Sequence, residues 1–379
     1  GAIHADGDAA HGRGGHVERG VGPSGTLTLD QGAVVSATGT EPGSLRLRAP
    51  VVGGNDIAIS KMDADLSHAG NITLEAVLPA VNVSGSPTQA DFDSYAAAAT
   101  SYVGAAAGVI QARLNPLGRV HYELQPGIEL QRSGDLNLNA LELSAWRFDG
   151  APAALTVRAT GNVSVLGSIS DGFISDGSGL PGSTDLLPGN SSTVRIAAGA
   201  NLSATDPLTL DEHTASDLSL APGVQLRTGT GDLQLAASRD LIIGSGASIY
   251  TGGLAAIPTQ YSVFGQGASF ATGGGALDVR ALRDVVGNPV VQSVTGWLTR
   301  LGSTTDPIRW GTDVSQFAWN LGTLGGGDLR VRAGRDVTEI SAATADSAVV
   351  SDDLSSTTYY GGGALQVDAA NDMNGGVFY

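Results

Sequence analysis

Residues 231–253 read GDLQLAASRDLIIGSGASIYTGG, and this stretch decides the fold. From Leu233, aliphatic side chains alternate with others over five residues, and Asp240 then opens a second short alternation. Strict alternation is typical of a β-strand with one buried face. Asn and Asp suit the bend between two such strands, because they tolerate left-handed backbone and hydrogen-bond their own main chain. The stretch therefore predicts a unit of strand, tight bend and strand.

The first strand of this unit recurs as Φ-x-Φ-x-Ala, where Φ is aliphatic. Its copies begin at Leu45, Ile72, Leu136, Leu155, Val194, Leu233, Leu277, Leu329 and Leu365, with weaker copies at Leu27 and Leu218. In six copies an Asn or Asp follows the alanine by three positions. These residues predict a structural ladder of bends at Asn162, Asn201, Asp240, Asp284, Asp336 and Asp372. A calcium ladder is the alternative, but the tight GGxGxD repeat is missing.

The spacing of the copies favours a coil that winds once per unit. Copies start 19 residues apart from Leu136 to Leu155 and 52 apart from Leu277 to Leu329, which extra coils or corner loops accommodate. Antiparallel hairpins would need turn signals, and Asn374-Gly375 is the only Asn-Gly pair. Glycine before many strands supplies corner dihedrals. The sequence thus predicts an all-β fold, a right-handed parallel β-helix, with the usual hand of parallel crossovers.

We expect residues 1–24 to be an irregular N-terminal segment and residues 25–379 to form a single β-helix with three inserts. Residues 86–115 predict a helix, capped by Ser86 and ended by Asn115-Pro116, that is either laid against the solenoid or used as a lid. Residues 171–192 read as a loop. Residues 288–324 predict an irregular insertion with helix-like spacing from Asp313 to Leu321.

Composition excludes several classes of function. The 379 residues contain no Cys, so disulfides, thiolate metal sites and Cys nucleophiles are excluded. With 37 acidic against 20 basic residues, the net charge of −17 repels phosphates and argues against a nucleic-acid partner. The segment from Ser94 to Ala112 is too rich in Ala, Ser, Thr and Tyr to predict a stable membrane span.

Four stretches of the chain resemble the filamentous haemagglutinin family. They are residues 231–253, GGGDLRVRAGRDV at 325–337, SLRLRAPVVGGNDIAI at 44–59 and LTVRATGNVSVLGSISDG at 155–172. The resemblance covers the chain from about residue 25 to its end. It implies a right-handed β-helical filament on the surface of a Gram-negative bacterium, exported by two-partner secretion through an outer-membrane transporter. It further implies a role in adhesion or biofilm formation, and it supplies no catalytic residue and no cofactor.

The chain departs from that family in one respect. The Asn-Pro-Asn motifs of the family's secretion domain are absent, since Asn115-Pro116 and Asn288-Pro289 lack the following Asn. We therefore expect an internal or C-terminal shaft segment whose export signal lies elsewhere. The expected function is a non-catalytic structural and adhesive shaft, secreted to the cell surface, and the alternative is a passive stalk without ligand.

Three tryptophans are the candidates for a binding site. Trp297, Trp310 and Trp319 gather in the third insert, and flat aromatic rings with a polar handle suit the CH faces of sugars. They predict contact with a glycan or a cell-surface receptor. The alternative is that they anchor the insert in the core.

Two groups of side chains suggest chemistry, and solvated loops are the alternative for both. Asp171, Asp176 and Asp185 crowd one loop, as a β-helical carbohydrate-active enzyme would require, but no polygalacturonase-type sequence run accompanies them. Near the N-terminus, His4, His11 and His16 match no recognised metal-ligand spacing. We therefore predict no catalytic residue and no metal site.

Overall fold

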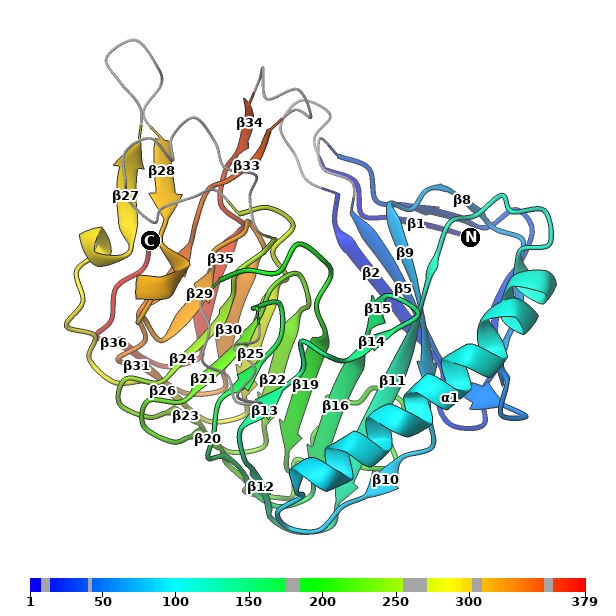
Figure 1. The fold of residues 1–379 in the computed structure, drawn as a ribbon. Helices are drawn as coiled ribbons and strands as arrows, with labels where there is room; N and C mark the ends of the chain where they lie inside the picture. The colour runs from blue at the N-terminus through cyan, green and yellow to red at the C-terminus, as the bar shows by residue number, and fades with distance from the viewer. Residues whose placement is uncertain (8–13, 40–42, 175–184, 255–270, 302–308, 351–356) are drawn as a thin grey trace.

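The Φ-x-Φ-x-Ala strands lie side by side in one long parallel sheet (Figure 1). The computed structural model describes residues 1–7, 14–39, 43–174, 185–254, 271–301, 309–350 and 357–379. The strands of the long sheet, in order, are β2 (His16–Gly20), β5 (Ser44–Val52), β9 (Asn71–Val77), β11 (Glu123–Arg132), β16 (Ala154–Ala159), β19 (Thr193–Ala198), β22 (Leu233–Ala237), β25 (Leu277–Ala281), β30 (Leu329–Ala333) and β35 (Leu365–Ala369). The short strands β6 (Asp56–Ile57) and β10 (Val81–Asn82) pair at its side.

Equivalent residues of successive copies are in register. Leu233 pairs with Leu277, and Leu277 pairs with Leu329. Leu277, Val279 and Ala281 are at most 2% exposed, whereas the residues between them are less buried. Aliphatic side chains therefore stack in columns inside the coil, and the hydrophobic effect favours one register over all others.

Two further parallel sheets complete the coils and confirm the predicted parallel β-helix. The second sheet contains β12 (Leu136–Leu138), β17 (Val163–Val165), β20 (Leu218–Leu220), β23 (Leu241–Ile243), β26 (Val285–Val286), β31 (Val337–Thr338) and β36 (Met373–Asn374). The third contains β13 (Leu141–Glu142), β18 (Ile169–Ser170), β21 (Gln225–Thr228), β24 (Ser248–Thr251), β29 (Leu321–Thr323) and β32 (Ala342–Thr344). The copies at Leu136 and Leu218 belong to the second sheet instead, and the copy at Leu27 lies in a separate strand pair, so these three assignments to the long sheet are wrong.

The prediction of an irregular segment over residues 1–24 is wrong. β1 (Ala2–His4) pairs with β4 (Val34–Ser36), which pairs with β8 (Asp65–His68), and β2 pairs with β5. In the pairing of β2 with β5, Val17 is buried beside Leu45. The next position on the same face, beside Leu47, is occupied by Arg19 instead of an aliphatic residue. A strand at the end of a sheet has only one neighbouring strand, so it tolerates such a charged side chain. The sequence of β2 therefore lacks the aliphatic alternation by which a strand is recognised. Another N-terminal pair joins β3 (Leu27–Leu29) to β7 (Ile59–Met62).

The glycines before the strands allow close approach between coils. A Cβ at Gly275 would lie 2.2 Å from the carbonyl oxygen of Gly231, and one at Gly327 would lie 2.0 Å from that of Gly275. None of these three glycines has a positive φ. The expectation that they supply corner dihedrals is therefore wrong at these positions, where any side chain would collide with the preceding coil.

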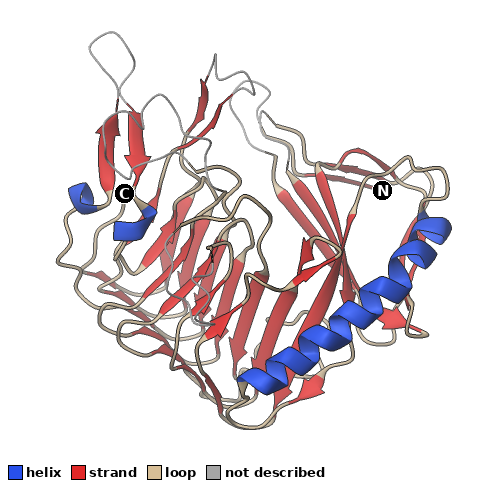
Figure 2. Ribbon diagram, viewed as in Figure 1, coloured by secondary structure: helices blue, strands red, loops and turns tan. Residues whose placement is uncertain are grey.

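The predicted helix forms as α1 (Gln89–Leu114) and packs against the solenoid, along β6, β7, β11 and β14 (Arg147–Phe148) (Figure 2). Its N-cap is Thr88, in a capping box with Asp91, and not Ser86 as predicted. Near its C-terminus, Arg113 binds Asp56 and the carbonyl of Ile57. Within the described ranges, no helix is both long and apolar enough to cross a membrane.

The insertion at 288–324 is mostly irregular, as predicted. It contains the 3₁₀ turns η2 (Val294–Gly296) and η3 (Val314–Gln316) and the antiparallel pair β27 (Leu298–Leu301) and β28 (Arg309–Thr312). Of the helix-like segment expected from Asp313 to Leu321, only the 3₁₀ turn η3 forms. Leu321 begins β29 of the third sheet, so the segment cannot continue as a helix to that residue. Other antiparallel pairs in the described ranges are β5 with β6, β14 with β15 (Ala151–Pro152) and β33 (Ser347–Val350) with β34 (Thr357–Tyr360).

We predict that Gly275→Ala lowers the free energy of unfolding by about 2 kcal/mol or more, because the added methyl overpacks the contact with Gly231. Urea unfolding followed by circular dichroism measures the change. Gly189→Ala is the matched control, since a Cβ there meets no atom within 4 Å and its φ is not positive. Equal stability of the two variants would contradict the close-approach role.

Candidate functional site

The long sheet changes direction at β11, where a cleft opens. The first half of β11 pairs with β9 through Glu123–Gly127, whereas its second half pairs with β16 through Gly127–Arg132. Pro126 lies in the first half, and having no N–H it suits a strand edge rather than a fully paired position. The strands β2, β5 and β9 therefore stand at an angle to the later coils (Figure 1).

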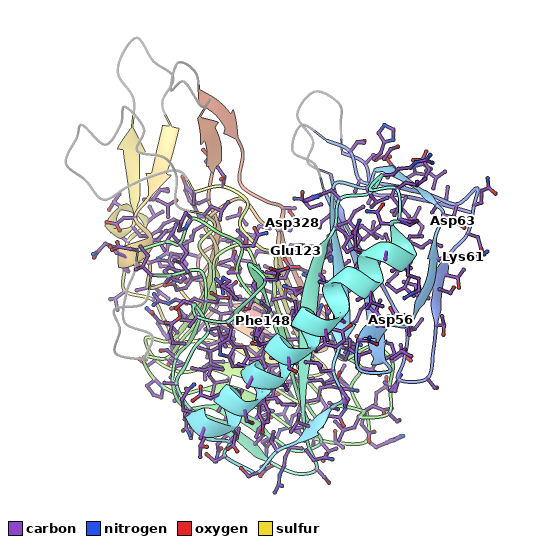
Figure 3. The ribbon with its side chains drawn as sticks, turned by 45° about the vertical axis from the view of Figure 1, so that its right-hand side comes forward. Asp56, Lys61, Asp63, Glu123, Phe148 and Asp328 are labelled. Atoms are coloured by element: carbon purple, nitrogen blue, oxygen red, sulfur yellow. The ribbon has the colours of Figure 1, made fainter. Side chains whose placement is uncertain are left out.

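A cleft of about 400 Å³ lies between this N-terminal arm and the later coils. On one side it is lined by the starts of β2, β5 and β9, and on the other by Asn190, Thr230 and the glycine-rich turns before β22, β25 and β30. Glu123 and Asp328 both line it and lie between the two parts of the molecule in Figure 3. The cleft thus exists because half of β11 has no strand partner on the β16 side.

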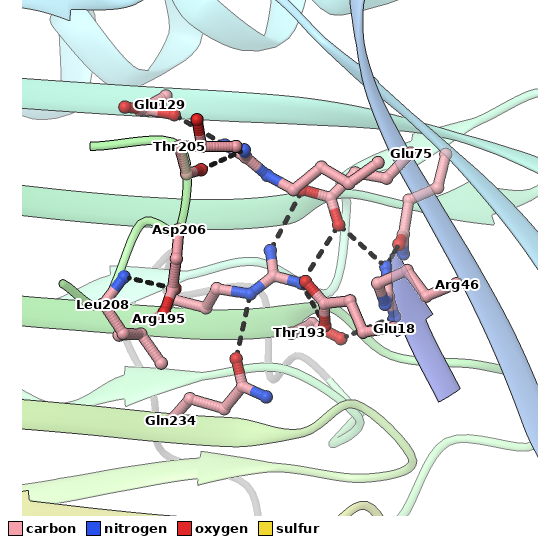
Figure 4. A network of polar contacts seen from close by, with 12 residues as sticks. Glu18, Arg46, Glu75, Glu129, Thr193, Arg195, Thr205, Asp206, Leu208 and Gln234 are labelled. Atoms are coloured by element: carbon pink, nitrogen blue, oxygen red, sulfur yellow. Dashed lines mark hydrogen bonds and ion pairs between the residues drawn. The ribbon is translucent and has the colours of Figure 1, made fainter. Parts of the chain in front are cut away.

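A buried network of charged residues lies on the outer face of the long sheet, between the arm and the later coils (Figure 4). Glu75 on β9 is its centre. Its carboxylate lies 3.0 Å from both Nη1 and Nη2 of Arg195 on β19, 3.1 Å from Nη1 of Arg46 and 3.2 Å from Nε of Arg48. Arg195 also reaches Glu18 at 3.4 Å. Charged groups so deeply buried must be paired, and this pairing holds the arm at its angle.

A second carboxylate extends this network toward the other end of the strands. Glu129 on β11 accepts hydrogen bonds of 2.7 Å from Arg48 and from Arg158. Arg158 also donates to the main-chain carbonyls of Asn201 and Ala204. Strands β5, β11 and β16 are thereby joined to the loop that follows β19.

Ion pairing sets the protonation of the network. Burial disfavours the ionised form of Glu75, but the guanidinium groups of Arg195, Arg46 and Arg48 outweigh it, so the pKa of Glu75 is lowered. For Glu129, burial is likewise outweighed by hydrogen bonds from Arg158 and Gln131, and its pKa is also lowered. Both groups are therefore ionised in the folded protein at neutral pH.

Glu123 in the cleft shows the opposite behaviour. Burial raises its pKa, although a hydrogen bond with Asn190 and the nearby charge of Arg46 act in the other direction. Among the described residues no ion pair to Glu123 is formed within 4.0 Å. It is therefore a half-buried carboxyl group that is hydrogen-bonded to Asn190 but has no cationic partner in the described part of the chain.

The predicted bend residues form a hydrogen-bonded ladder along the start of the second sheet. Each side-chain oxygen accepts from the main-chain N–H of the equivalent residue on the next coil, at 2.7–3.2 Å. The rungs are Asp135, Asn162, Asp217, Asp240, Asp284, Asp336 and Asp372, separated by 27, 55, 23, 44, 52 and 36 residues. The coil lengths vary widely while the rung geometry is kept.

Asn201 was wrongly included in this ladder, and Asp135 and Asp217 were missed. Asn201 is exposed at the start of a loop, where its side chain accepts from Ser203. Asp135 and Asp217 precede Leu136 and Leu218 as Asp240 precedes Leu241, and this local signal was available in the sequence. None of the rungs has a positive φ, so the predicted left-handed bends are also wrong, and the side chains act as hydrogen-bond acceptors instead.

An arginine strengthens three of these rungs. Arg239 binds Asp217, Arg283 binds Asp240 and Arg335 binds Asp284, each through Nε and Nη2. Each arginine comes from the coil after its aspartate. These fork-shaped contacts join neighbouring coils through side chains as well as main chain.

The tryptophan prediction fails for two of its three residues. Trp297 and Trp319 are 1% and 2% exposed. Their ring centroids lie 5.5 Å apart in an edge-to-face arrangement, in a cluster with Phe317 and Tyr250. Their faces are therefore unavailable for stacking on a sugar, and they anchor the insertion. The side chain of Trp310 lies outside the described part of the structure.

The structure places only some of the residues that were considered for catalysis and metal binding. Asp171 is fully buried and accepts from Arg147 and from the main-chain N–H groups of Gly172 and Ser192, which fixes the base of the 171–192 insertion. Asp176 and His11 lie outside the described residues, and the main-chain carbonyl of Asp185 accepts from the Ile174 N–H at the base of the same insertion. His4 lies 3.4 Å from Asp6, and His16 lies 3.8 Å from Glu18. In the described ranges no three His, Asp or Glu side chains gather in a metal-binding group.

The central residues of the charged network were not identified from the sequence. Arg48 and Glu75 pair in register at a spacing of 27 residues, so their opposite charges on adjacent copies were a usable signal. The approach of Arg195 to Glu75 joins residues 120 positions apart across the bend, and no local pattern predicts it.

Comparison of the chain with protein-family models, with characterised proteins and with solved structures found no match.

We predict that Asp284→Ala lowers the free energy of unfolding by about 1–2 kcal/mol, because Arg335 and the Asp336 N–H lose their acceptor. Asp372→Ala is the control, because among the described residues the carboxylate of this exposed last rung accepts a hydrogen bond only from Asn371. This substitution should change the free energy of unfolding by less than about 0.5 kcal/mol. Chemical denaturation of both variants gives the comparison. A loss at Asp372 as large as that at Asp284 would refute the ladder's role.

We also predict that acid weakens the charged network. Because the folded-state pKa values of Glu75 and Glu129 are lowered, their contribution to stability is present above the unfolded value of about 4.5 and is lost as pH falls through the folded values. Urea unfolding at pH 7, 5 and 3.5 should show a stability that declines mainly below pH 4.5. Glu75→Gln should be destabilised at pH 7 by about 3 kcal/mol or more. It should also show a shallower decline in acid, and a decline as steep as wild type would contradict this assignment.

Proposed function

We propose that this chain is a structural and adhesive shaft of a secreted, surface-exposed bacterial exoprotein of the filamentous haemagglutinin type, and that it is not an enzyme. The observation that carries the proposal is the parallel stack of coils, in register from β2 to β35. In such a stack each coil is stabilised mainly by its neighbours, so the architecture extends in one direction and suits a spacer that projects from a surface.

The physical chemistry of the stack supports export in an unfolded state. The chain contains no Cys, and its coils are held by main-chain pairing, aliphatic columns and the aspartate ladder. Such coils can fold one after another as they emerge from a pore, each on the template of the last. A net charge of −17 keeps the emerging chain soluble. The outer-membrane transporter of a two-partner system is the partner that this route requires.

The adhesive part of the proposal is supported by the asymmetry of the surface. The insertion with β27 and β28, the hairpin β33–β34 and the cleft interrupt the regular coils, whereas connections such as those from β22 to β23 and from β30 to β31 are short (Figures 1 and 2). Loops and clefts on a rigid scaffold are the usual places for recognition. We expect attachment to depend on this irregular side.

Two measurements test the proposal. Antibodies against the purified chain should label intact cells of the bacterium that makes it, and labelling should be lost when the outer-membrane transporter is deleted. Beads coated with the chain should attach to cells or to a polysaccharide matrix more often than beads coated with albumin.

Catalysis is tested on the same preparation, by assaying the release of reducing ends from a panel of polysaccharides. We expect no release. Steady release that is lost in Glu123→Gln would overturn the non-catalytic assignment, and labelling only of lysed cells would overturn the surface assignment.

A further inference from the structure

A second pocket lies where the chain leaves β9, and it shares no lining residue with the cleft. Its volume is about 260 Å³, and every residue that lines it belongs to the described ranges. It is enclosed by the turn at 21–23, by the ends of β5 and β9 with residues 79–80, and by the loop at 202–205. The turn and the loop meet closely, since a Cβ at Gly22 would lie 2.9 Å from Oγ1 of Thr205. We call this site the β9 pocket.

The walls of the β9 pocket are apolar side chains that the fold leaves half-buried. They include Val21, Val51, Val77, Leu78 and Leu202. Inside the coils, by contrast, the aliphatic columns are almost completely buried. Apolar surface that lines a concave site without being covered gains from contact with an apolar ligand. The walls therefore suit a ligand with a mainly apolar body.

The floor of the β9 pocket is the Glu129 end of the charged network (Figure 4). Arg48 and Arg158 each donate to Glu129 at 2.7 Å, and Arg48 also binds Glu75 at 3.2 Å. The ionic groups of the floor thus already have partners of opposite charge. A charged ligand would lose its hydration in this site without a free counter-ion to offset the cost. The floor therefore favours an uncharged ligand.

The amide oxygen of Gln131 is the polar group that the pocket offers to a ligand. Gln131 lies two positions after Glu129 on β11, so both side chains lie on the same face of the strand. Its Nε2 donates to Glu129 at 2.8 Å, and this contact fixes the direction of the amide, because an ionised carboxylate only accepts. Oε1 accepts no hydrogen bond from the described residues, and it is not among the unpaired atoms that are shut off from solvent. An accessible acceptor of this kind suits a ligand with a hydroxyl or N–H group.

The size of the β9 pocket restricts the ligand to one or two rings. An apolar cavity of about 150 Å³ is enough for benzene, whereas sites for drug-sized molecules begin at about 300 Å³. The volume of about 260 Å³ lies between these values. A ring also loses less conformational freedom on binding than a flexible chain of the same volume. A compact cyclic molecule therefore fits best.

We propose that the β9 pocket binds a compact, uncharged cyclic molecule of the phenol or indole class, whose hydroxyl or N–H group donates to Oε1 of Gln131. The ring packs against the half-buried aliphatic walls. Because these walls come from β5 and β9 on one side and from the loop at 202–205 on the other, the bound ring contacts the N-terminal arm and the later coils together. This inference goes beyond the proposed shaft function and does not depend on it.

The test is titration of the purified chain with p-cresol and indole, followed by calorimetry and ligand-observed NMR. Both probes should bind saturably, with dissociation constants of about 1 mM or lower. Their comparators are 4-methylanisole and N-methylindole, in which a methyl group replaces the donor hydrogen. Each probe should bind about fivefold more tightly than its comparator, as one neutral hydrogen bond predicts. The anion 4-methylbenzoate should bind more weakly than p-cresol.

Gln131→Leu separates the hydrogen bond from the rest of the site. This variant keeps a side chain of similar size and removes the acceptor. The affinity for 4-methylanisole should stay as in wild type, and the preference for p-cresol over 4-methylanisole should disappear. Misfolding would instead weaken the binding of both molecules.

Ala80→Trp locates the binding site, because Ala80 is exposed at the rim of the β9 pocket and an indole there obstructs it. It should weaken the binding of both probes roughly tenfold or more. Ala98→Trp is the matched control, since it places the same indole on the exposed face of α1, and it should bind as wild type does. All variants should keep the wild-type circular dichroism.

Four results would each overturn the proposal. They are the absence of saturable binding by both probes, tighter binding of 4-methylbenzoate than of p-cresol, an unchanged preference for p-cresol in Gln131→Leu, and unchanged binding in Ala80→Trp. None of these results bears on attachment of coated beads or on labelling of cells, so the shaft function is tested separately.

Discussion

In-register pairing of each strand with its copy on the next coil is the constraint on which the rest of the structure depends. It places Leu on Leu and Ala on Ala inside the coil, and it brings each ladder aspartate within reach of the next coil's main-chain N–H. A slip by one residue would turn every aliphatic column toward water. Glycine at the close contacts enforces the same alignment, because the strands meet there without room for a side chain.

Register alone does not account for the bend of the molecule. That bend arises at β11, where pairing passes from β9 to β16 along the length of one strand. The outer faces of the two parts then approach each other, and their charged side chains become buried. Glu75 and Arg195, both nearly inaccessible, show the consequence, since two such groups are tolerated inside a protein only when they neutralise each other. The network thus gives the bend a defined geometry.

The cleft is a further consequence of the same bend. A regular solenoid pairs every strand on both sides, so it presents a smooth face with few concave sites. Here the first half of β11 has no strand partner on the β16 side, and Glu123 and Arg46 line the opening. The insertion at 288–324, by contrast, buries Trp297 and Trp319 in its own hydrophobic cluster. A loop of that length needs such a cluster to be ordered. Recognition is therefore best sought where pairing is incomplete.

The sequence by itself determined the coil, because alternation, the Φ-x-Φ-x-Ala copies and the Asp-aliphatic pairs are local patterns imposed by the strand's two-residue period. It also determined the helix, whose ends carry their own capping residues. Only the tertiary structure decided the cleft, the burial of Trp297 and Trp319, and the meeting of Glu75 with Arg195. Those features depend on contacts between residues far apart in the chain, across a bend that no short segment encodes.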